Sequence, residues 1–385
     1  MKRTVYNEDH EAFRAVIRDF IVKEVAPHFT GWEAAGLPPR NLFRKLGELG
    51  VMGFGIPEEY GGPGHTGHKY QAIISEETAL AGVALGHYHV SSGIVLPYLL
   101  HLATDEQKRR WFPAIATGDL MLCVAMTEPG TGSDLAGIRT TARLSEDGSH
   151  YVLNGAKTFI TGALNSELCV VAARTSPGTA DDRRAGLSLL VVETGAKGFA
   201  FGRKLEKIGL KSSDTNEISF SDVKVPIENL LGEEGRGFSY LGQNLPRERL
   251  QIGVSATSAA TAAIRFAQAY VAERSVFGKP VAAFQNTKFV LAECDTEVAA
   301  AQALVDRGLD LEESGELTPA DAARIKLFCT ETAGRVIDKC LQLHGGYGYM
   351  LEYPIARLYA DTRVNRIYGG TSEVMKTIIA KDMGL

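Results

Sequence analysis

Three glycine-rich turns in this sequence combine small hydroxyl side chains with backbone that a ligand could approach closely. The first, MTEPGTGSD at 126–134, follows an apolar run that favours a β-strand. The second, LQLHGGYGY at 341–349, places a glycine pair at the end of a predicted helix, where backbone can approach a pyrophosphate. The third, IYGGTSE at 367–373, precedes a helix whose N-terminus could bind an anion. Each turn alone is most simply a plain turn or helix cap.

A fourth segment, LPRERL at 245–250, holds a carboxylate, Glu248, between two arginines. Pro246 is typical of the first position of a helix, so we expect Glu248 in the first helical turn, where the helix dipole favours its ionised form. The alternative is a helix-terminal charge with no task. An apolar ligand closing over Glu248 would raise its pKa, so that it could accept a proton near working pH.

The sequence contains none of the short motifs that mark several other classes of enzyme. We find no Walker A motif, no HExxH, no GxSxG, and no strand-to-helix GxGxxG of a dinucleotide-binding Rossmann fold. The five cysteines are scattered without a CxxC pair, which predicts no disulfide framework and no metal site. The net charge of −5 gives no reason to expect nucleic-acid binding, which needs a clustered basic face.

The apolar segments are expected to form a protein core. The longest apolar stretch, residues 79–102, contains Pro97 and several histidines and serines, so we interpret it as a buried helix pair and expect no membrane span. The N-terminal residues show no apolar leader and no Arg/Ser-rich transit segment, and we therefore expect a cytoplasmic protein.

The elements that carry these residues change type along the chain. Helical periodicity extends from Glu8 to about Thr117, short β-rich runs separated by turns follow to about Pro226, and long helices with apolar faces return from Gly237. The predicted fold is α+β, with an N-terminal helical domain at 1–119, a middle antiparallel β-domain at 120–228 and a C-terminal four-helix bundle at 229–385.

Taken together and in this order, the motifs resemble those of the acyl-CoA dehydrogenase family. The similarity covers essentially the full chain and includes FIT at 159–161 after a strand, RSVFG at 274–278, Gln285 and the LPRERL segment, which is similar to the long-chain and isovaleryl branches. The resemblance implies FAD bound between the β-domain and the C-terminal bundle. It also implies a homo-oligomer, a dimer of dimers, in which Arg274 and Gln285 reach an FAD held mainly by another subunit.

The resemblance further implies the residues of each site. Those expected to bind FAD are Met126, Thr127, Gly132, Ser133, Phe159, Ile160, Thr161, Arg274, Phe277, Gln285, Gln342, Leu343, Gly345, Gly346, Thr371 and Glu373. Those expected to bind the substrate are Ser133, Pro246, Arg249, Tyr368, Gly369 and Gly370.

The sequence departs from the common family pattern at one catalytic position. Many members carry the base as a glutamate directly before the Gly-Thr/Ser turn, where this chain has Gly369. We therefore predict that Glu248 is the catalytic base. Glu128 and Glu373 are weaker candidates because their neighbours belong to the flavin-binding turns.

The expected reaction is FAD-dependent α,β-dehydrogenation of a saturated acyl-CoA to the trans-2-enoyl-CoA, with electron-transfer flavoprotein as the acceptor. Pro97 lies in a region that floors the acyl pocket of long-chain-type relatives, and favours a medium-to-long or branched acyl group. The alternatives are a dehydrogenase of acyl-carrier-protein thioesters, an oxidase, and a non-catalytic acyl-CoA-binding subunit of a hetero-oligomer.

Overall fold

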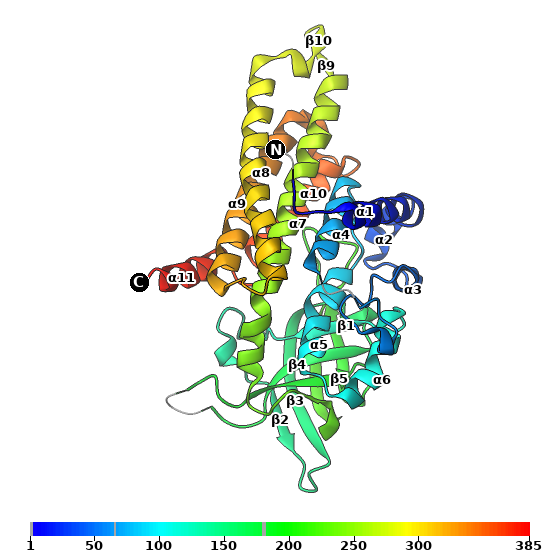
Figure 1. Cartoon of the computed structure of the whole chain (residues 1–385), viewed down its shortest axis with the longest axis vertical. Helices are drawn as coiled ribbons and strands as arrows, with labels where there is room; N and C mark the ends of the chain where they lie inside the picture. The colour runs from blue at the N-terminus through cyan, green and yellow to red at the C-terminus, as the bar shows by residue number, and fades with distance from the viewer. Residues whose placement is uncertain (1–2, 65–66, 179–181) are drawn as a thin grey trace.

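The computed structural model describes residues 3–64, 67–178 and 182–385. Met1 and Lys2, which belong to the predicted first domain and to the segment inspected for a leader, lie outside the described residues. Figure 1 shows an N-terminal group of helices, a β-sheet region and a tall C-terminal helical bundle that rises from beside the sheet.

The N-terminal helices begin at polar caps and bury their apolar faces together. The Asn7 side chain accepts a hydrogen bond from His10 N, and the Thr104 side chain accepts one from Gln107 N. Ile17 and Phe43 belong to a core shared by the first, third and fourth of these helices, whereas Leu99 and Trp111 of the last two helices pack with residues of the β-sheet. The helices are α1 (Glu8–Phe20), α2 (Phe29–Ala35), α3 (Asn41–Glu48), α4 (His68–Leu80), α5 (Leu96–Leu102) and α6 (Asp105–Ala116).

Residues 79–102 do not form the predicted helix pair. They contain the end of α4, a loop, and a π-helical turn (His89–Val95) that continues into α5. Pro97 lies at the start of α5, and because it has no N–H for an α-helical bond, a wider turn before it relieves the mismatch. No helix in the described part of the chain has both the length and the apolar character that a membrane span requires.

The middle region forms an eight-stranded sheet in the order β6-β7-β3-β2-β4-β5-β8, with β1 beside β4. Most neighbours are antiparallel, as predicted, but β1 and β2 each pair with β4 in parallel. The strands are β1 (Leu122–Ala125), β2 (Thr141–Leu144), β3 (His150–Thr161), β4 (Leu168–Arg174), β5 (Leu187–Glu193), β6 (Phe199–Lys204), β7 (Thr215–Pro226) and β8 (Leu230–Leu231).

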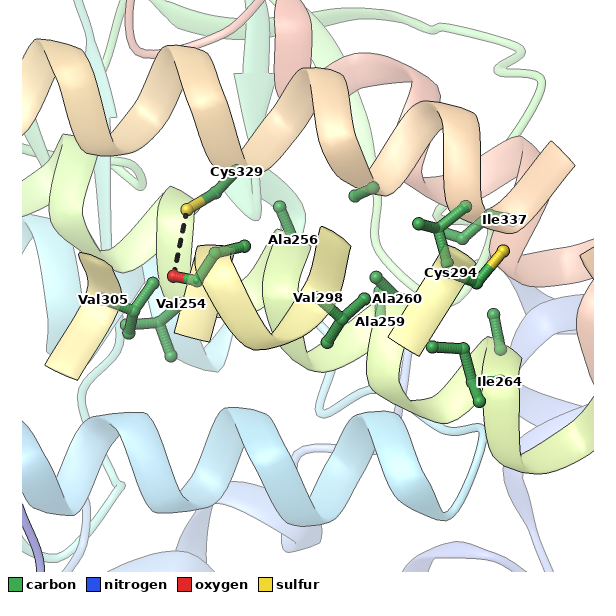
Figure 2. Close-up of a cluster of buried hydrophobic side chains, with 14 of the residues drawn as sticks. Val254, Ala256, Ala259, Ala260, Ile264, Cys294, Val298, Val305, Cys329 and Ile337 are labelled. Carbon is green, nitrogen blue, oxygen red and sulfur yellow. Dashed lines mark hydrogen bonds between the residues drawn. The ribbon is translucent and has the colours of Figure 1, made fainter. Parts of the chain in front are cut away.

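The C-terminal bundle packs three long helices around a core of small residues. Alanines and valines of α7 interlock with Cys294 and Val298 of α8 and with Cys329 and Ile337 of α9, as Figure 2 shows. The elements are α7 (Gly237–Glu273), α8 (Gln285–Glu313), α9 (Pro319–Leu343), α10 (Pro354–Thr362), α11 (Ser372–Asp382) and the short hairpin β9 (Ser275–Val276) and β10 (Lys279–Pro280).

The predicted start of the helix that carries Glu248 is wrong. Helix α7 begins at Gly237, so Pro246 is an internal proline and Glu248 lies several turns from the N-terminus. The helix dipole acts mainly on the first turn, and it therefore does not account for the charge state of Glu248.

Candidate active site

Glu248 and Gly369 compete for the same space. The Glu248 side chain is buried, and its Oε1 lies 3.2 Å from the point where a Cβ at residue 369 would stand. Ile252 Cδ1 lies closer still to that point. Gly369 also has φ +63°, a conformation that disfavours residues with side chains. The carboxylate at this place is therefore that of Glu248 on α7, and the turn before α11 contributes no side chain at residue 369.

The surroundings of Glu248 act on its ionisation in opposite directions. Burial raises the pKa of the Glu248 carboxyl, while the positive charges of Arg249 and Lys326 lower it. The net effect is a raised pKa, as a proton acceptor working near neutral pH requires. Within the described residues its Oε2 has no hydrogen-bond partner.

Lys326 is a buried cation that fastens the glycine turn beside Glu248. Its Nζ donates hydrogen bonds to the carbonyl oxygens of Asn365 at 2.9 Å and Gly370 at 2.7 Å. Burial and the charge of Arg249 lower the pKa of Lys326 to about 8, against the opposing effect of Glu248. The sequence contains a signal for this residue, because Lys326 lies on the apolar face of α9 with Ile325 and Cys329.

Arg249 makes a second attachment to the same turn. Its Nε donates to the carbonyl oxygen of Gly369 at 3.2 Å, and the side chain is buried. Burial lowers the pKa of Arg249 and the Glu248 carboxylate raises it, with a net lowering. Pro246 is also buried, whereas Tyr368 is 40% exposed and donates its hydroxyl to Asn365 Oδ1 at 2.6 Å.

The first glycine-rich turn is held against the sheet by an internal ion pair. Lys157 Nζ lies 2.9 Å from Glu128 Oε1 and also donates to Met126 O at 2.9 Å. The Glu128 carboxylate further accepts backbone N–H bonds from Arg139 and Thr140. Burial raises the pKa of Glu128, but these hydrogen bonds and the lysine lower it further, so the net shift is downward. Glu128 therefore stabilises the turn and, with a lowered pKa, is a poor candidate for the catalytic base.

Beyond that ion pair, the first turn presents its small residues to solvent. Gly132 and Ser133 are exposed, and Thr127 is partly buried. The carbonyl of Thr127 accepts a hydrogen bond from Thr158 N at 3.0 Å, which fastens the turn to β3.

The FIT segment forms the end of strand β3, not a loop after it. The register of β3 against β7 shifts between Lys157 and Ile160, and Phe159 within this bulge has φ +61°. As a result the Phe159 side chain is 67% exposed, whereas Ile160 is buried in the sheet core. Thr161 is partly buried. Phe159 thus presents its aromatic ring outward, whereas the Ile160 side chain is enclosed in the sheet core.

The second glycine-rich turn borders a cavity of about 500 Å³. Helix α9 ends at Leu343, and a side chain added at Gly345 or Gly346 would meet nothing within 4 Å. Arg274 lines the same cavity, with its guanidinium 5.7 Å from the centre of the Tyr347 ring. The structure therefore joins Arg274, Leu343, Gly345 and Gly346 in one cavity, while the side chain of Gln342 is exposed next to them.

The β9–β10 hairpin and the start of α8 lie at the end of the bundle farthest from the sheet (Figure 1). Phe277, in the turn of the β9–β10 hairpin, is 95% exposed, and Gln285 is the first residue of α8. Twenty-six residues of continuous chain separate Glu248 from Arg274, about 39 Å of helix at 1.5 Å per residue. These outer residues are therefore remote from Glu248 of the same chain.

The third turn caps helix α11. Thr371 Oγ1 accepts a hydrogen bond from Val374 N at 3.4 Å, and Ser372 donates to Glu331. Glu373 is exposed at this helix N-terminus, and hydrogen bonds from its own backbone and from Thr371 lower its pKa. A carboxylate so stabilised is a poor proton acceptor.

Comparison with known proteins gives one consistent match. The N-terminal, middle and C-terminal domain models of acyl-CoA dehydrogenases match residues 7–119, 123–223 and 235–384. A mitochondrial long-chain specific acyl-CoA dehydrogenase of Sus scrofa is 44% identical over 382 residues, 99% of this chain and 88% of that protein.

Solved structures agree with the sequence matches. An acyl-CoA dehydrogenase from Geobacillus kaustophilus has a TM-score of 0.95 at 44% identity, with 100% of both chains covered. An acyl-CoA dehydrogenase complexed with FAD from Bacillus anthracis has a TM-score of 0.90 at 32% identity, covering 100% of this chain and 69% of that one. This chain belongs to the acyl-CoA dehydrogenase family and is a flavin-dependent oxidoreductase.

Proposed function

We propose that the protein oxidises a saturated acyl-CoA to its trans-2-enoyl-CoA, with Glu248 as the base that removes the α-proton. The observation that carries this proposal is the 3.2 Å approach of Glu248 Oε1 to the side-chain position that Gly369 leaves empty. Many family members are expected to place a glutamate at the position of Gly369. In this chain Glu248 on α7 brings a carboxylate to the same place.

FAD is the proposed cofactor, and the residues fit it. Gly345 and Gly346 leave their backbone open toward a cavity that also contains the cationic Arg274, as a pyrophosphate requires. The exposed aromatic ring of Phe159 on β3 would be covered by a large planar ligand, and that of Phe277 by the ligand of another subunit. When bound, FAD supplies the acceptor for the hydride that leaves Cβ. We assign the remaining binding contacts to Thr127, Ser133, Thr161, Gln285, Gln342 and Thr371, among the residues expected from the sequence.

The protein's own part in the reaction is to remove a weakly acidic proton. Glu248 must be ionised before substrate binds, and burial that raises its pKa makes it a stronger acceptor once water has left. Arg249 and Lys326 both bond to carbonyl oxygens of the Gly369–Gly370 turn and so fix its orientation. The backbone N–H of Gly369 could then hold the thioester oxygen as negative charge develops on it.

The finer details of the substrate and partners are part of this proposal. The long-chain specific relative and the widened helix before Pro97 support a medium-to-long or branched acyl group. Exposure of Phe277 and its distance from Glu248 support a homo-oligomer in which Arg274, Phe277 and Gln285 serve the FAD of another subunit. Gly345 and Gly346, which share the cavity of Arg274, would then bind the pyrophosphate of that same FAD. Electron-transfer flavoprotein as the acceptor and a cytoplasmic location remain predictions from the sequence.

Anaerobic titration of the purified protein tests the function directly. Saturated acyl-CoA thioesters of increasing chain length should bleach the flavin absorbance, and Glu248→Gln should retain flavin and ligand but bleach about 10²–10⁴ times more slowly. Glu146→Gln, at an exposed carboxylate between β2 and β3, is the control and should bleach at the wild-type rate. Wild-type bleaching rates in Glu248→Gln would refute its role as the base.

The same titration separates the alternative carriers and acceptors. Faster bleaching by an acyl-carrier-protein thioester than by the matching acyl-CoA would favour a biosynthetic dehydrogenase. Rapid reoxidation by oxygen would favour an oxidase. A purified protein without flavin, or with flavin that no thioester bleaches, would favour a non-catalytic acyl-CoA-binding subunit.

A further inference from the structure

Unpartnered buried polar atoms gather where α4, α7 and the π-helical turn before α5 meet. Seven of the twelve such atoms in the described residues belong to side chains of these elements or of α5. They are His68 Nε2, Gln71 Oε1, His89 Nδ1, Tyr98 OH, Glu248 Oε2, Gln251 Oε1 and, farther along α7, Thr257 Oγ1.

Five side chains form one group, which we call the buried polar cluster: His68, Gln71, Ser75, His89 and Gln251. Gln251 Nε2 donates to Ser75 Oγ at 2.7 Å, and Ser75 Oγ lies 3.4 Å from His89 Nε2. His68, Gln71 and Ser75 share one face of α4, at i, i+3 and i+7.

The buried polar cluster continues directly from the catalytic region. Gln251 follows Glu248 by three residues on α7, so the two share a face and are separated by about 4.5 Å along the helix axis. Tyr98, whose pKa is raised by burial and then by the charge of Glu248, lies on the α5 side of the same region. An acyl chain that extended from Glu248 toward Pro97, the region expected to floor the acyl pocket, would therefore meet polar side chains.

An unbranched hydrocarbon chain is a poor binding partner for the buried polar cluster. A buried donor or acceptor without a partner costs about 1–3 kcal/mol, so a pocket for a simple alkyl chain favours aliphatic side chains. His68, Gln71, His89, Tyr98 and Gln251 each have one polar atom without a partner, and methylene groups alone would leave those atoms unsatisfied. An occupant that donates and accepts hydrogen bonds would satisfy them.

The charges of the cluster specify a neutral occupant. Burial lowers the pKa of His89 to about 4 and lowers that of His68 well below its usual value, so both imidazoles are uncharged at neutral pH. The nearby cation Arg247 already donates to His68 Nδ1 at 3.2 Å and pairs with Glu312 at 3.4 Å. No group of the cluster itself would neutralise a carboxylate.

We propose that the acyl group of the preferred substrate carries a neutral oxygen substituent, a hydroxyl or oxo group, a few carbons beyond Cβ, where the buried polar cluster receives it. This inference rests on the proposed acyl-CoA dehydrogenation and narrows its substrate class. The substituent would accept from the imidazole or amide N–H groups, and a hydroxyl would also donate to the amide oxygen of Gln71 or Gln251.

Steady-state kinetics of the flavin-loaded enzyme with matched thioesters test the proposal. Octanoyl-CoA is compared with its 5-, 6-, 7- and 8-hydroxy derivatives, and at least one hydroxy isomer should exceed the parent in kcat/KM by about tenfold, the worth of a satisfied hydrogen bond. Gln251→Leu should remove or reverse that preference by raising activity on octanoyl-CoA and lowering it on the hydroxy isomer.

A milder variant keeps the test decisive if Gln251→Leu does not fold. Ser75→Ala deletes one hydroxyl of the cluster and should reduce the hydroxy-to-parent ratio at least threefold. Ser258→Ala is the matched control, because Ser258 is a buried serine of α7 that donates to Val254 O of its own helix, and it should leave the ratio unchanged.

The outcomes distinguish this inference from the function on which it rests. If octanoyl-CoA is oxidised faster than every hydroxy isomer and the ratio is the same in Ser75→Ala and Ser258→Ala, the cluster only holds buried water and the inference is wrong. In that case bleaching by octanoyl-CoA still supports the dehydrogenase. If neither octanoyl-CoA nor any isomer bleaches the flavin, the proposed function itself fails.

Discussion

The Glu248 carboxylate lies 3.2 Å from the place where a Cβ at Gly369 would be, although the two residues are 121 positions apart in the chain. A side chain on the turn before α11 would therefore crowd the carboxylate on α7 and also Ile252. We expect positions 248 and 369 to change together in related chains.

Gly369→Ala should impair the enzyme by displacing Glu248. The added methyl would meet Ile252 Cδ1 and Glu248 Oε1, and alanine disfavours the φ of +63°. We expect the free energy of unfolding to fall by about 1–3 kcal/mol and kcat to fall at least tenfold. Denaturant unfolding and flavin-reduction rates measure the two effects. In the control Gly195→Ala, nothing lies within 4 Å of the new methyl, and wild-type values are expected.

The stability gain from Glu248→Gln should depend on pH. Burial, offset in part by Arg249 and Lys326, raises the pKa of Glu248 in the folded protein. Folded wild-type protein thus binds this proton more tightly than unfolded protein does, and the associated stability is lost as pH rises through the folded pKa. Glu248→Gln should therefore raise the thermal unfolding midpoint at pH 8 and lose that advantage toward pH 5.

The opposite sign is expected at a paired surface carboxylate. A hydrogen bond from Lys45 lowers the pKa of Glu24. Glu24→Gln should therefore give no stabilisation at pH 8. A Glu248→Gln variant that is less stable than wild type at pH 8 would contradict the raised pKa.

Lys326→Met should shift the pH profile of flavin reduction. The positive charges of Lys326 and Arg249 lower the pKa of Glu248, and Tyr98 and Tyr368 are the other titratable groups that interact with it. Removing Lys326 should move the acid limb of the kcat profile to higher pH. Loss of its bonds to Asn365 and Gly370 should also cost about 1–3 kcal/mol of stability.

Lys339→Met is the matched control on the same helix. Lys339 forms partly exposed ion pairs with Glu293 and Glu297 and should contribute about 0–1 kcal/mol. If Lys326→Met lost stability but kept the wild-type acid limb, Lys326 would serve the turn alone and have no influence on the base.

Phe277→Ala should weaken flavin binding without affecting the fold. The ring is 95% exposed in the single chain, so the flavin-free protein should unfold at the wild-type temperature. Covering such a ring with ligand contributes about 1.5–3 kcal/mol, and its loss should weaken FAD binding by roughly 10–100-fold. Flavin content after dilution and gel filtration measures this. Tyr349→Ala removes another exposed ring, 85% exposed, and should retain flavin.

The three-part fold was predictable from the sequence because periodicity changes sharply twice along the chain. The helix start at Pro246 was not. Because proline has no N–H, it usually occupies the first turn of a helix. Here Pro246 lies inside the helix and leaves the carbonyl of Gly242, four residues earlier, without its helical hydrogen bond. Gly242 has open space beside it, so the proline is accommodated. Apolar packing of the whole 37-residue helix outweighed the local signal.

The three glycine-rich turns could be located from the sequence, but the orientations of the side chains near them could not. Alternation along β3 gives no indication that a bulge turns Phe159 outward, because the register shift depends on pairing with β7. Lys326 and the buried polar cluster were also missed. Polar residues on apolar helix faces were the available signal, and only the packed structure identifies which of them meet.

Helix α7 carries Glu248 near the sheet and delivers the chain to Arg274 and Phe277 at its far end without interruption. Inserting or deleting one residue between them would rotate one end by about 100° relative to the other and shift it by 1.5 Å. A substitution in α7 can leave this relation between its two ends intact, but an insertion or deletion cannot. In homologues, gaps should therefore fall in surface loops, while the spacing from 248 to 274 stays constant.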